Sequence, residues 1–272
     1  MKAFPDMSCL PLSLVSSAVL APHGFFTRIG GVSVGPFASL NCSLSGQDDR
    51  ASVLENRARA ARAIGADPNF LVGLTQVHGP DVIRVEEPWL AGAGPRADAM
   101  VTDRPGVALG IVTADCAPVL FADLSAGVVG AAHAGWRGAV AGVLEATIVA
   151  MEALGATRAG IAAAIGPCIR QPSYEVAADL RDAVLAADPA DARFFADGAR
   201  NARWLFDLAG YCAARLGDAG IGAVDTIQAD TLADASRFFS HRRRTLANVA
   251  ANEGKAAEPI GHQLSVIALP NA

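Results

Sequence analysis

Three side chains in this sequence combine metal-binding or nucleophilic chemistry with a position beside a turn: His78, Cys116 and His133. A glycine and a proline follow His78, so a turn between two strands presents its imidazole. Cys116 and His133 each stand at the rim of an apolar run. Thiolate and imidazole are both good zinc ligands, and three protein ligands leave one position for water or substrate. We expect these residues to hold one zinc ion with an open coordination position.

Spacing alone leaves other interpretations open. The intervals of 38 and 17 residues match none of the short Cys/His spacings of structural zinc modules. In one alternative, Cys116 is a thiolate nucleophile with His133 as its base, as in a cysteine hydrolase or amidase. In another, Cys116 is simply a small apolar core residue. Asp98 and Asp115 are candidates to accept a hydrogen bond that fixes a histidine tautomer, or to cap a turn.

The elements that must position these residues are short buried strands joined by turns and helices. Continuous apolar character indicates strands covered on both faces, and it predicts strands over 97–102, 107–113, 118–122, 127–132 and 159–165. Further strands are expected within residues 1–24 and over 70–76, 81–85, 224–228 and 263–269. Helices are expected from a cap at 48–49 through 64, over 138–154, from a cap at 173 through 187, and over 204–216.

Composition limits the class of protein. The 272 residues are 52% hydrophobic and 18% charged, which excludes a disordered chain. No apolar run is long enough to span a bilayer, and a net charge of −5 argues against a nucleic-acid partner. Five dispersed cysteines do not form a disulfide framework, which favours a reducing cytoplasm. No linker or internal repeat divides the chain, so residues 1–272 are predicted to form one domain.

Basic residues provide candidates for anion binding. Arg28 follows an apolar pair at an expected strand end, where a guanidinium can bind phosphate or carboxylate through two parallel hydrogen bonds, or form a surface salt bridge. The HRRR cluster at 241–244 is either a solvated loop or an anion contact at the mouth of a site. Net charge makes this cluster a local feature rather than a nucleic-acid surface.

Nine motifs span the chain from about residue 24 to residue 269. They are TRIGGVS (27–33), SLN (39–41), ENR (55–57), TQVHG (75–79), ADAMVTD (97–103), TADCAPVL (113–120), AAHAGWRG (131–138), AIGPCI (164–169) and FFSHRR (238–243). In this order they closely resemble the laccase-domain, or polyphenol-oxidase, family. The resemblance implies a mixed α/β (α+β) fold, a single four-layer α/β/β/α domain with mixed sheets. It also implies a metal, zinc or alternatively copper, held by His78, Cys116 and His133.

The activity that the resemblance implies is phosphorolysis of adenosine, inosine and methylthioadenosine to free base and ribose 1-phosphate, with adenosine deamination alongside. Purine nucleosides and phosphate would then be the partners of a monomer or small homo-oligomer. Arg28 is the first candidate for phosphate binding, followed by Arg57 and Arg243. Cys116, His133 and Asp115 are the candidate catalytic residues, with Asp115 as a proton carrier in deamination.

Two alternatives remain beside this activity. One is the cysteine hydrolase or amidase that uses Cys116 and His133, including an enzyme that proofreads peptidoglycan precursors. The other is a copper-dependent phenol oxidase, for which the sequence offers only five histidines. His23, His241 and His262 are dispersed, which disfavours a multinuclear centre.

The chain departs from the family pattern at two places near its C-terminal end. Asp230, Thr231 and Leu232 stand where family members often carry a cysteine before a threonine. Gly261, His262 and Gln263 end an extended segment where a pattern with an arginine is usual. These changes put in doubt any role of that cysteine or that arginine, but they leave the three expected metal ligands intact.

Overall fold

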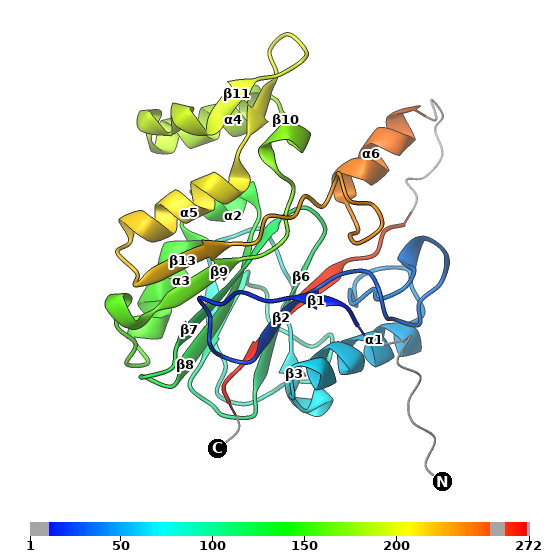
Figure 1. Cartoon of the computed structure of the whole chain (residues 1–272), viewed down its shortest axis with the longest axis vertical. Coiled ribbons are helices and arrows are strands. Elements are labelled where there is room, and N and C mark those ends of the chain that lie inside the picture. The colour runs from blue at the N-terminus through cyan, green and yellow to red at the C-terminus, as the bar shows by residue number, and fades with distance from the viewer. Residues whose placement is uncertain (1–10, 251–258, 271–272) are drawn as a thin grey trace.

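The computed structural model describes residues 11–250 and 259–270. Two β-sheets lie face to face, and helices cover the outer face of each sheet, which gives four layers in the order α/β/β/α (Figure 1). This arrangement confirms the expected mixed α/β fold. Residues 1–10 of the expected first strand lie outside the described residues, and residues 11–24 contribute only a short strand and the start of another.

The larger sheet has six strands and mixed direction. In spatial order the strands are β13 (Ala223–Thr226), β9 (Ala162–Ile165), β7 (Ala117–Asp123), β8 (Val128–Ala134), β5 (Ala99–Thr102) and β4 (Val82–Arg84). The neighbours β9, β7, β8 and β5 pair antiparallel, whereas the edge strands β13 and β4 pair parallel to their neighbours. The outer face of this sheet is covered by α3 (Val143–Glu152) and α5 (Leu208–Asp218).

The second sheet has five strands, and helix α1 (Arg50–Ala63) covers its outer face. Its order is β1 (Ser13–Leu14), β2 (His23–Phe26), β14 (Gln263–Ala268), β6 (Ala108–Thr113) and β3 (Leu71–Val72). Helix α1 begins as predicted, because the Asp49 carboxylate accepts a hydrogen bond from the backbone N–H of Ser52. The C-terminal strand β14 lies in the middle of this sheet, so the end of the chain is built into the core.

Strand β7 shows why the buried strands are apolar on both faces. Val119 and Phe121 pack in the cluster beneath the helices, whereas Leu120 and Ala122 pack in the cluster between the two sheets. Successive side chains of a strand point to opposite faces, so a strand between two apolar layers needs hydrophobic residues at every position. Full burial of each large apolar side chain contributes about 1.5–3 kcal/mol. The continuous apolar runs in the sequence therefore specify the two central layers.

Three helix predictions differ from the structure. Gly142 adopts φ +91°, and it divides the expected 138–154 helix into α2 (Trp136–Val140) and α3. Ser173 does not cap a helix, because its hydroxyl donates to Asp230, and helix α4 (Ala178–Ala187) starts only after strand β10 (Glu175–Val176). The expected 204–216 helix begins as strand β12 (Trp204–Phe206), and Asp207 caps α5.

One further strand and one further α-helix lie where the sequence predicted neither. Strand β11 (Phe195–Asp197) completes a small three-stranded sheet with β10 and β12. Helix α6 (His241–Ala250) occupies part of the stretch predicted as a polar loop. Its N-terminus is held by the Ser240 hydroxyl, which accepts the backbone N–H of Arg243. Within residues 11–250 and 259–270, no helix is both long and apolar enough to cross a membrane.

Candidate metal centre

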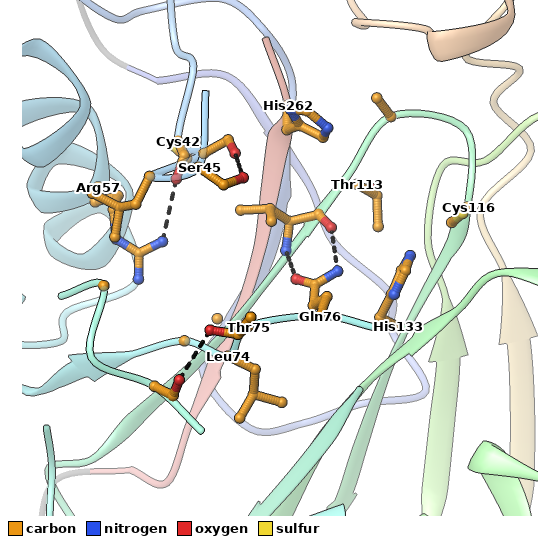
Figure 2. A pocket seen from close by; sticks show the side chains of 18 of the residues that line it. Cys42, Ser45, Arg57, Leu74, Thr75, Gln76, Thr113, Cys116, His133 and His262 are labelled. Carbon is orange, nitrogen blue, oxygen red and sulfur yellow. Dashed lines mark hydrogen bonds between the residues drawn. The ribbon is translucent and has the colours of Figure 1, made fainter. Parts of the chain in front are cut away.

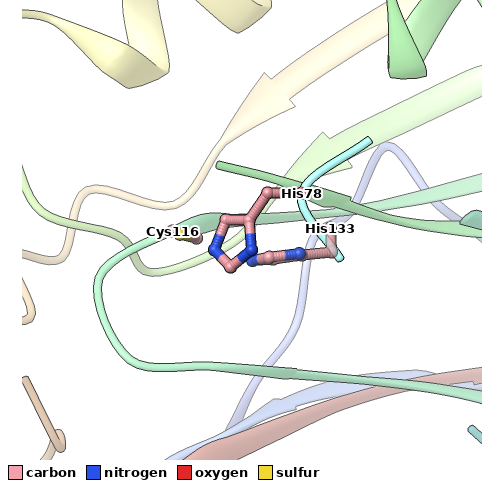
Figure 3. Close-up of side chains that lie close together, drawn as sticks. All are labelled: His78, Cys116 and His133. Atoms are coloured by element: carbon pink, nitrogen blue, oxygen red, sulfur yellow. The ribbon is translucent and has the colours of Figure 1, made fainter. Parts of the chain in front are cut away.

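His78, Cys116 and His133 lie together at one end of the six-stranded sheet (Figure 3). Their ligand atoms are all within 4.8 Å of one another, and the two imidazole rings meet edge to face with centroids 4.7 Å apart. His133 is on strand β8, Cys116 precedes strand β7, and His78 lies in the loop between β3 and β4. The pairing of Ala117 with Ala134 across β7 and β8 brings the cysteine and His133 to the same end of the sheet. Residues 38 and 17 positions apart in sequence thus meet through strand pairing.

Asp98 orients both histidines of this cluster. Its buried carboxylate accepts the Nδ1 hydrogen of His133 at 2.7 Å, which directs Nε2 of that ring away from Asp98. The same carboxylate accepts three consecutive backbone N–H groups, those of Val77, His78 and Gly79, at 3.0, 2.9 and 2.8 Å. This contact stabilises the turn in which His78 adopts φ +63°. Burial tends to raise the pKa of Asp98, but the hydrogen bonds from His133 and the backbone outweigh burial and lower the pKa.

Gly135 makes room for the three side chains. A Cβ atom at this position would lie 3.0 Å from Sγ of Cys116 and 3.0 Å from Cδ2 of His78. Real Cβ contacts are rarely so short, so a larger residue would push the thiol and the imidazole apart. Gly135 was not among the predicted site residues, although the first glycine of the HAGWRG motif is a visible signal of close approach.

The electrostatics of the cluster favour the ligand form of the cysteine. Burial raises the pKa of the Cys116 thiol, but the imidazoles of His133 and His78 outweigh burial and bring the pKa to about 6. Burial lowers the pKa of His133, whereas the Cys116 thiolate and the Asp98 carboxylate raise it, to about 9. A thiolate beside two imidazoles is a donor set that fits zinc, and three donors leave a fourth tetrahedral position for another ligand.

The cluster forms part of the wall of a cavity of about 580 Å³ (Figure 2). Gln76 joins two sides of this wall, because its amide donates to the carbonyl of Val112 and accepts the N–H of the same residue, at 2.8 and 3.0 Å. No aspartate or glutamate lines the cavity within the described part of the chain. The lining residues are Cys42, Ser43, Leu44, Ser45, Arg57, Gly73, Leu74, Thr75, Gln76, His78, Gly92, Gly94, Gly110, Val112, Thr113, Ala114, Cys116, His133, His241 and His262.

Residues 22–269 match the family model described as multi-copper polyphenol oxidoreductase laccase. The chain belongs to this laccase family. It is 42% identical over 236 residues to a protein of Deinococcus radiodurans named purine nucleoside phosphorylase, covering 86% of this chain and 88% of that one. It is 51% identical over 170 residues to purine nucleoside phosphorylase ORF3 of Streptomyces griseus, covering 62% and 69%. The crystal structure of YlmD from Geobacillus stearothermophilus superposes with a TM-score of 0.85 at 30% identity, covering 98% of this chain and 99% of that chain.

The three arginines expected to bind phosphate occupy different places in this laccase-family chain. Arg57, on helix α1, lines the cavity that contains the metal cluster. Arg28 and Arg243 instead line a separate cavity of about 200 Å³. The structure therefore brings one of the three predicted arginines into the same cavity as His78, Cys116 and His133.

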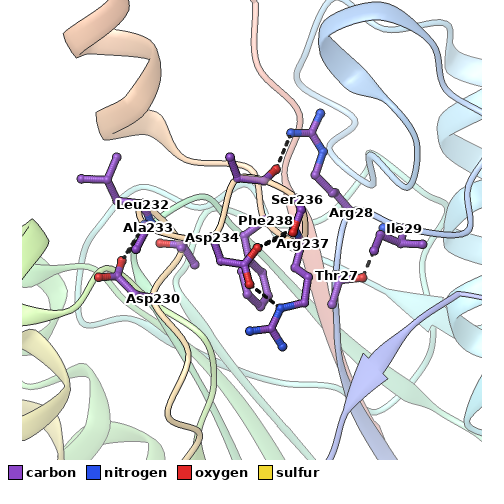
Figure 4. Close-up of polar contacts among 12 residues, drawn as sticks. Thr27, Arg28, Ile29, Asp230, Leu232, Ala233, Asp234, Ser236, Arg237 and Phe238 are labelled. Carbon is purple, nitrogen blue, oxygen red and sulfur yellow. Dashed lines mark hydrogen bonds and ion pairs between the residues drawn. The ribbon is translucent and has the colours of Figure 1, made fainter.

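The guanidinium of Arg28 contacts two backbone carbonyls and an aromatic ring of the protein itself. Its Nε donates to the carbonyl of Ala38 at 2.8 Å and its Nη1 to that of Ala235 at 3.2 Å, and its guanidinium lies 4.5 Å from the ring centroid of Phe239. Figure 4 shows the contact with the 230–238 segment, which is itself ordered by the side chains of Asp230 and Asp234. These contacts give Arg28 a structural role in joining the N-terminal and C-terminal segments.

Arg243 is likewise occupied by backbone carbonyls. Nη1 donates to Phe238, and Nη2 donates to Thr231 and Leu232, each at 3.0 Å or less. The guanidinium therefore fixes the segment that precedes helix α6. Thr231, one of the residues held by this guanidinium, is fully buried.

Asp115 contacts the C-terminal segment rather than a histidine. Its carboxylate accepts the hydroxyls of Thr231 and Ser240 at 2.7 and 2.9 Å, and the backbone N–H of Arg242 at 2.6 Å. Because Asp115 precedes Cys116, these hydrogen bonds join the cysteine loop to the start of helix α6. Among the two aspartates expected to orient a histidine, Asp98 makes that contact and Asp115 holds α6 in place.

The arrangement also brings in two histidines that the sequence left dispersed. His241 is the first residue of α6 and His262 precedes β14, and both line the cavity. Burial and the nearby charges of His241 and His133 lower the pKa of His262 to about 4, so its imidazole is neutral at pH 7. The Asp115 contacts hold the start of α6, where His241 lies, and the side chain of Asn41 accepts the backbone N–H of His262 at 2.9 Å. A single sequence does not reveal these tertiary contacts.

Proposed function

We propose that this protein is a zinc-dependent purine nucleoside phosphorylase that cleaves adenosine, inosine and methylthioadenosine, and that it also deaminates adenosine. The observation that carries the proposal is the His78–Cys116–His133 cluster on the wall of a cavity of about 580 Å³. Pockets for small molecules commonly measure about 300–1,000 Å³, so this cavity has the size for a nucleoside. The names of the curated relatives support the reaction class.

The chain's own residues would prepare the site as follows. His133 and His78 keep Cys116 as a thiolate, and Asp98 fixes the tautomer of His133 and the turn that carries His78. Zinc bound to these three residues would supply a Lewis acid that polarises a substrate atom or a water molecule. Such electrostatic effects commonly lower a barrier by several kcal/mol.

Phosphorolysis itself exchanges one bond at the ribose. An oxygen of inorganic phosphate forms a bond to C1′ while the bond from C1′ to the purine nitrogen breaks, and the purine leaves with that electron pair and takes up a proton. The products are the free base and ribose 1-phosphate, or 5-methylthioribose 1-phosphate when the substrate is methylthioadenosine. The reaction requires a site for an anion in the same cavity as the nucleoside. It also benefits from the absence of carboxylates among the described lining residues.

A direct assay tests the proposal. Purified protein with one equivalent of zinc is incubated with adenosine, inosine and methylthioadenosine, with and without phosphate. The free base and the sugar 1-phosphate are then separated and quantified, the latter being 5-methylthioribose 1-phosphate in the case of methylthioadenosine. We expect both products to form in equal amounts and only with phosphate, and inosine to form from adenosine. Absence of base release from every nucleoside would refute the phosphorylase assignment.

A cysteine hydrolase is the second candidate, favoured by the lowered pKa of Cys116 beside a protonated His133 that Asp98 orients. His78 distinguishes the two functions, because a cysteine–histidine pair does not need a second imidazole at the sulfur. His78→Ala and removal of zinc should abolish the phosphorylase. A hydrolase acting on amide substrates such as peptidoglycan precursors would retain its activity in both cases.

A further inference from the structure

Arg57 is a buried cation without a counter-charge. Arg57 lies on helix α1 and is only 6% exposed. Nη1 donates to the carbonyl of Cys42 at 3.3 Å, whereas Nη2 is buried without a hydrogen-bond partner in the described part of the chain. None of the ion pairs among residues 11–250 and 259–270 includes Arg57. A buried charge normally has a partner because desolvation is costly, so this guanidinium indicates a missing anion.

The neighbouring groups do not supply that negative charge. Burial raises the pKa of the Cys42 thiol to about 12, so the thiol is neutral at pH 7 although Arg57 lies beside it. The preceding residue on the helix shows the contrast. Asn56 is fully buried, and its side chain bonds Val32, Ser33, Ser39 and Asn41. The helix therefore uses Asn56 to order the glycine-rich loop, whereas Arg57 lines the cavity without a charged partner among the described residues.

The surroundings of Arg57 are suited to an oxyanion. Figure 2 shows Arg57 and Cys116 on opposite sides of the cavity, with Gln76 between them. A Cβ atom at Gly73 would lie 3.2 Å from Nη2 of Arg57, so the missing side chain leaves room beside the guanidinium. The hydroxyls of Ser43 and Ser45, 3.1 Å apart, line the same cavity and can donate to anion oxygens.

We propose that Arg57 forms a phosphate subsite at the end of the cavity opposite the His78–Cys116–His133 cluster. This inference rests on the proposed function, in which phosphate is a reactant. A guanidinium binds phosphate oxygens through parallel hydrogen bonds, and Nη2 is free for one of them. Arg28 and Arg243 are occupied by carbonyls in another cavity, so Arg57 is the arginine for this role. The phosphate is either inorganic phosphate or the 5′-phosphate of a nucleotide.

Thermal unfolding of four proteins tests the subsite without relying on activity. They are the wild type, Arg57→Met, Arg57→Gln and the control Arg62→Met, which alters an exposed arginine of the same helix. Millimolar inorganic phosphate should raise the melting temperature of the wild type and of Arg62→Met, and should leave the Arg57 variants unchanged. Without phosphate, Arg57→Met should be at least as stable as the wild type, because an unpaired buried charge is removed.

Adenosine 5′-monophosphate replaces inorganic phosphate in a second arm. If only the nucleotide stabilises the wild type, and does so through Arg57, the subsite holds a nucleotide phosphate. An equal response to both anions in the wild type and the Arg57 variants would overturn the subsite. If Arg57→Met does not fold, Arg57→Gln, which keeps a polar group at the same place, decides by the same criterion.

Kinetics separate this inference from the proposed function. In Arg57→Met we expect the KM for phosphate to rise about 10- to 100-fold, because charge-assisted hydrogen bonds are lost, with a much smaller change in the KM for nucleoside. Wild-type protein that binds phosphate through Arg57 but cleaves no nucleoside would refute the phosphorylase and retain the subsite. Nucleoside cleavage with an unchanged phosphate KM in Arg57→Met would retain the phosphorylase and refute the subsite.

Discussion

Replacing Asp98 with asparagine should weaken both the fold and the metal site, because one carboxylate serves both. Oδ1 accepts His133 Nδ1 and the backbone N–H of His78, and Oδ2 accepts the N–H groups of Val77 and Gly79. An asparagine amide has only one oxygen. In either orientation its NH2 group faces two N–H donors, which then lose their acceptor.

The magnitude follows from this count. Each buried donor left without an acceptor costs about 1–3 kcal/mol, so Asp98→Asn should lower the free energy of unfolding by about 2–6 kcal/mol. His133 also loses the partner that fixes its tautomer, and such a loss typically reduces metal affinity about 10- to 100-fold.

Two measurements on the same variant test this reasoning. Urea unfolding of the metal-free protein gives the free energy of unfolding, and competition with a chromogenic chelator gives the zinc affinity. Asp81→Asn is the matched control, because Asp81 is exposed and lies in the same loop region. Wild-type stability together with wild-type zinc affinity in Asp98→Asn would refute the role assigned to this carboxylate.

Three further predictions concern the same cavity. His78→Ala and Cys116→Ala should each lose bound zinc and nucleoside cleavage but keep a cooperative thermal transition. The control Cys212→Ala, which alters a cysteine in the core beneath the helices, should keep its zinc. One equivalent of bound metal in either ligand variant would contradict the ligand assignment. Gly135→Ala should bind zinc about tenfold or more weakly, since the added methyl crowds Cys116 and His78. Gly217→Ala, with open space around it, is the control, and equal affinities would exclude crowding. Burial, with the charges of His241 and His133, lowers the pKa of His262 from 6.5 to about 4. As the pH falls, the unfolded chain therefore binds a proton at this histidine before the folded protein does. The contribution of neutral His262 to the free energy of unfolding is fully present above pH 6.5 and falls by up to about 3 kcal/mol as the pH drops to 4. Urea unfolding of metal-free His262→Gln should show a shallower decline over this range than the wild type, and parallel curves would contradict the shift.

The sequence carried enough information for the central layers of the fold. Val119 to Ala122 are apolar at every position because they lie between two covered faces, and that pattern is visible without a structure. The helix start at Asp49 was also predictable, because its cap depends on residues only three positions apart. Local rules failed at Ser173, whose hydroxyl bonds Asp230 from another part of the chain instead of capping a helix. Tertiary partners of this kind are not encoded within a short window.

The candidate site was predictable in its ligands and not in its surroundings. His78, Cys116 and His133 were named from their chemistry, their turns and the family motifs, whereas Asp98 and Asp115 were equal candidates to orient a histidine or to cap a turn. For phosphate binding, the sequence favoured Arg28 over Arg57, whereas the proposed subsite uses Arg57. The reason is that carbonyl partners satisfy Arg28, whereas Arg57 is left with a free buried nitrogen. Which of two arginines is already occupied depends on the folded backbone.

X-ray absorption spectroscopy of the zinc-bound protein tests the central claim most directly. The extended X-ray absorption fine structure at the zinc K-edge reports which atoms surround the ion and at what distances. The account predicts one sulfur at about 2.3 Å and two imidazole nitrogens at about 2.0–2.1 Å, with one further light atom in the remaining position. A zinc shell without sulfur, or one with four protein ligands, would contradict the proposed open His78–Cys116–His133 site.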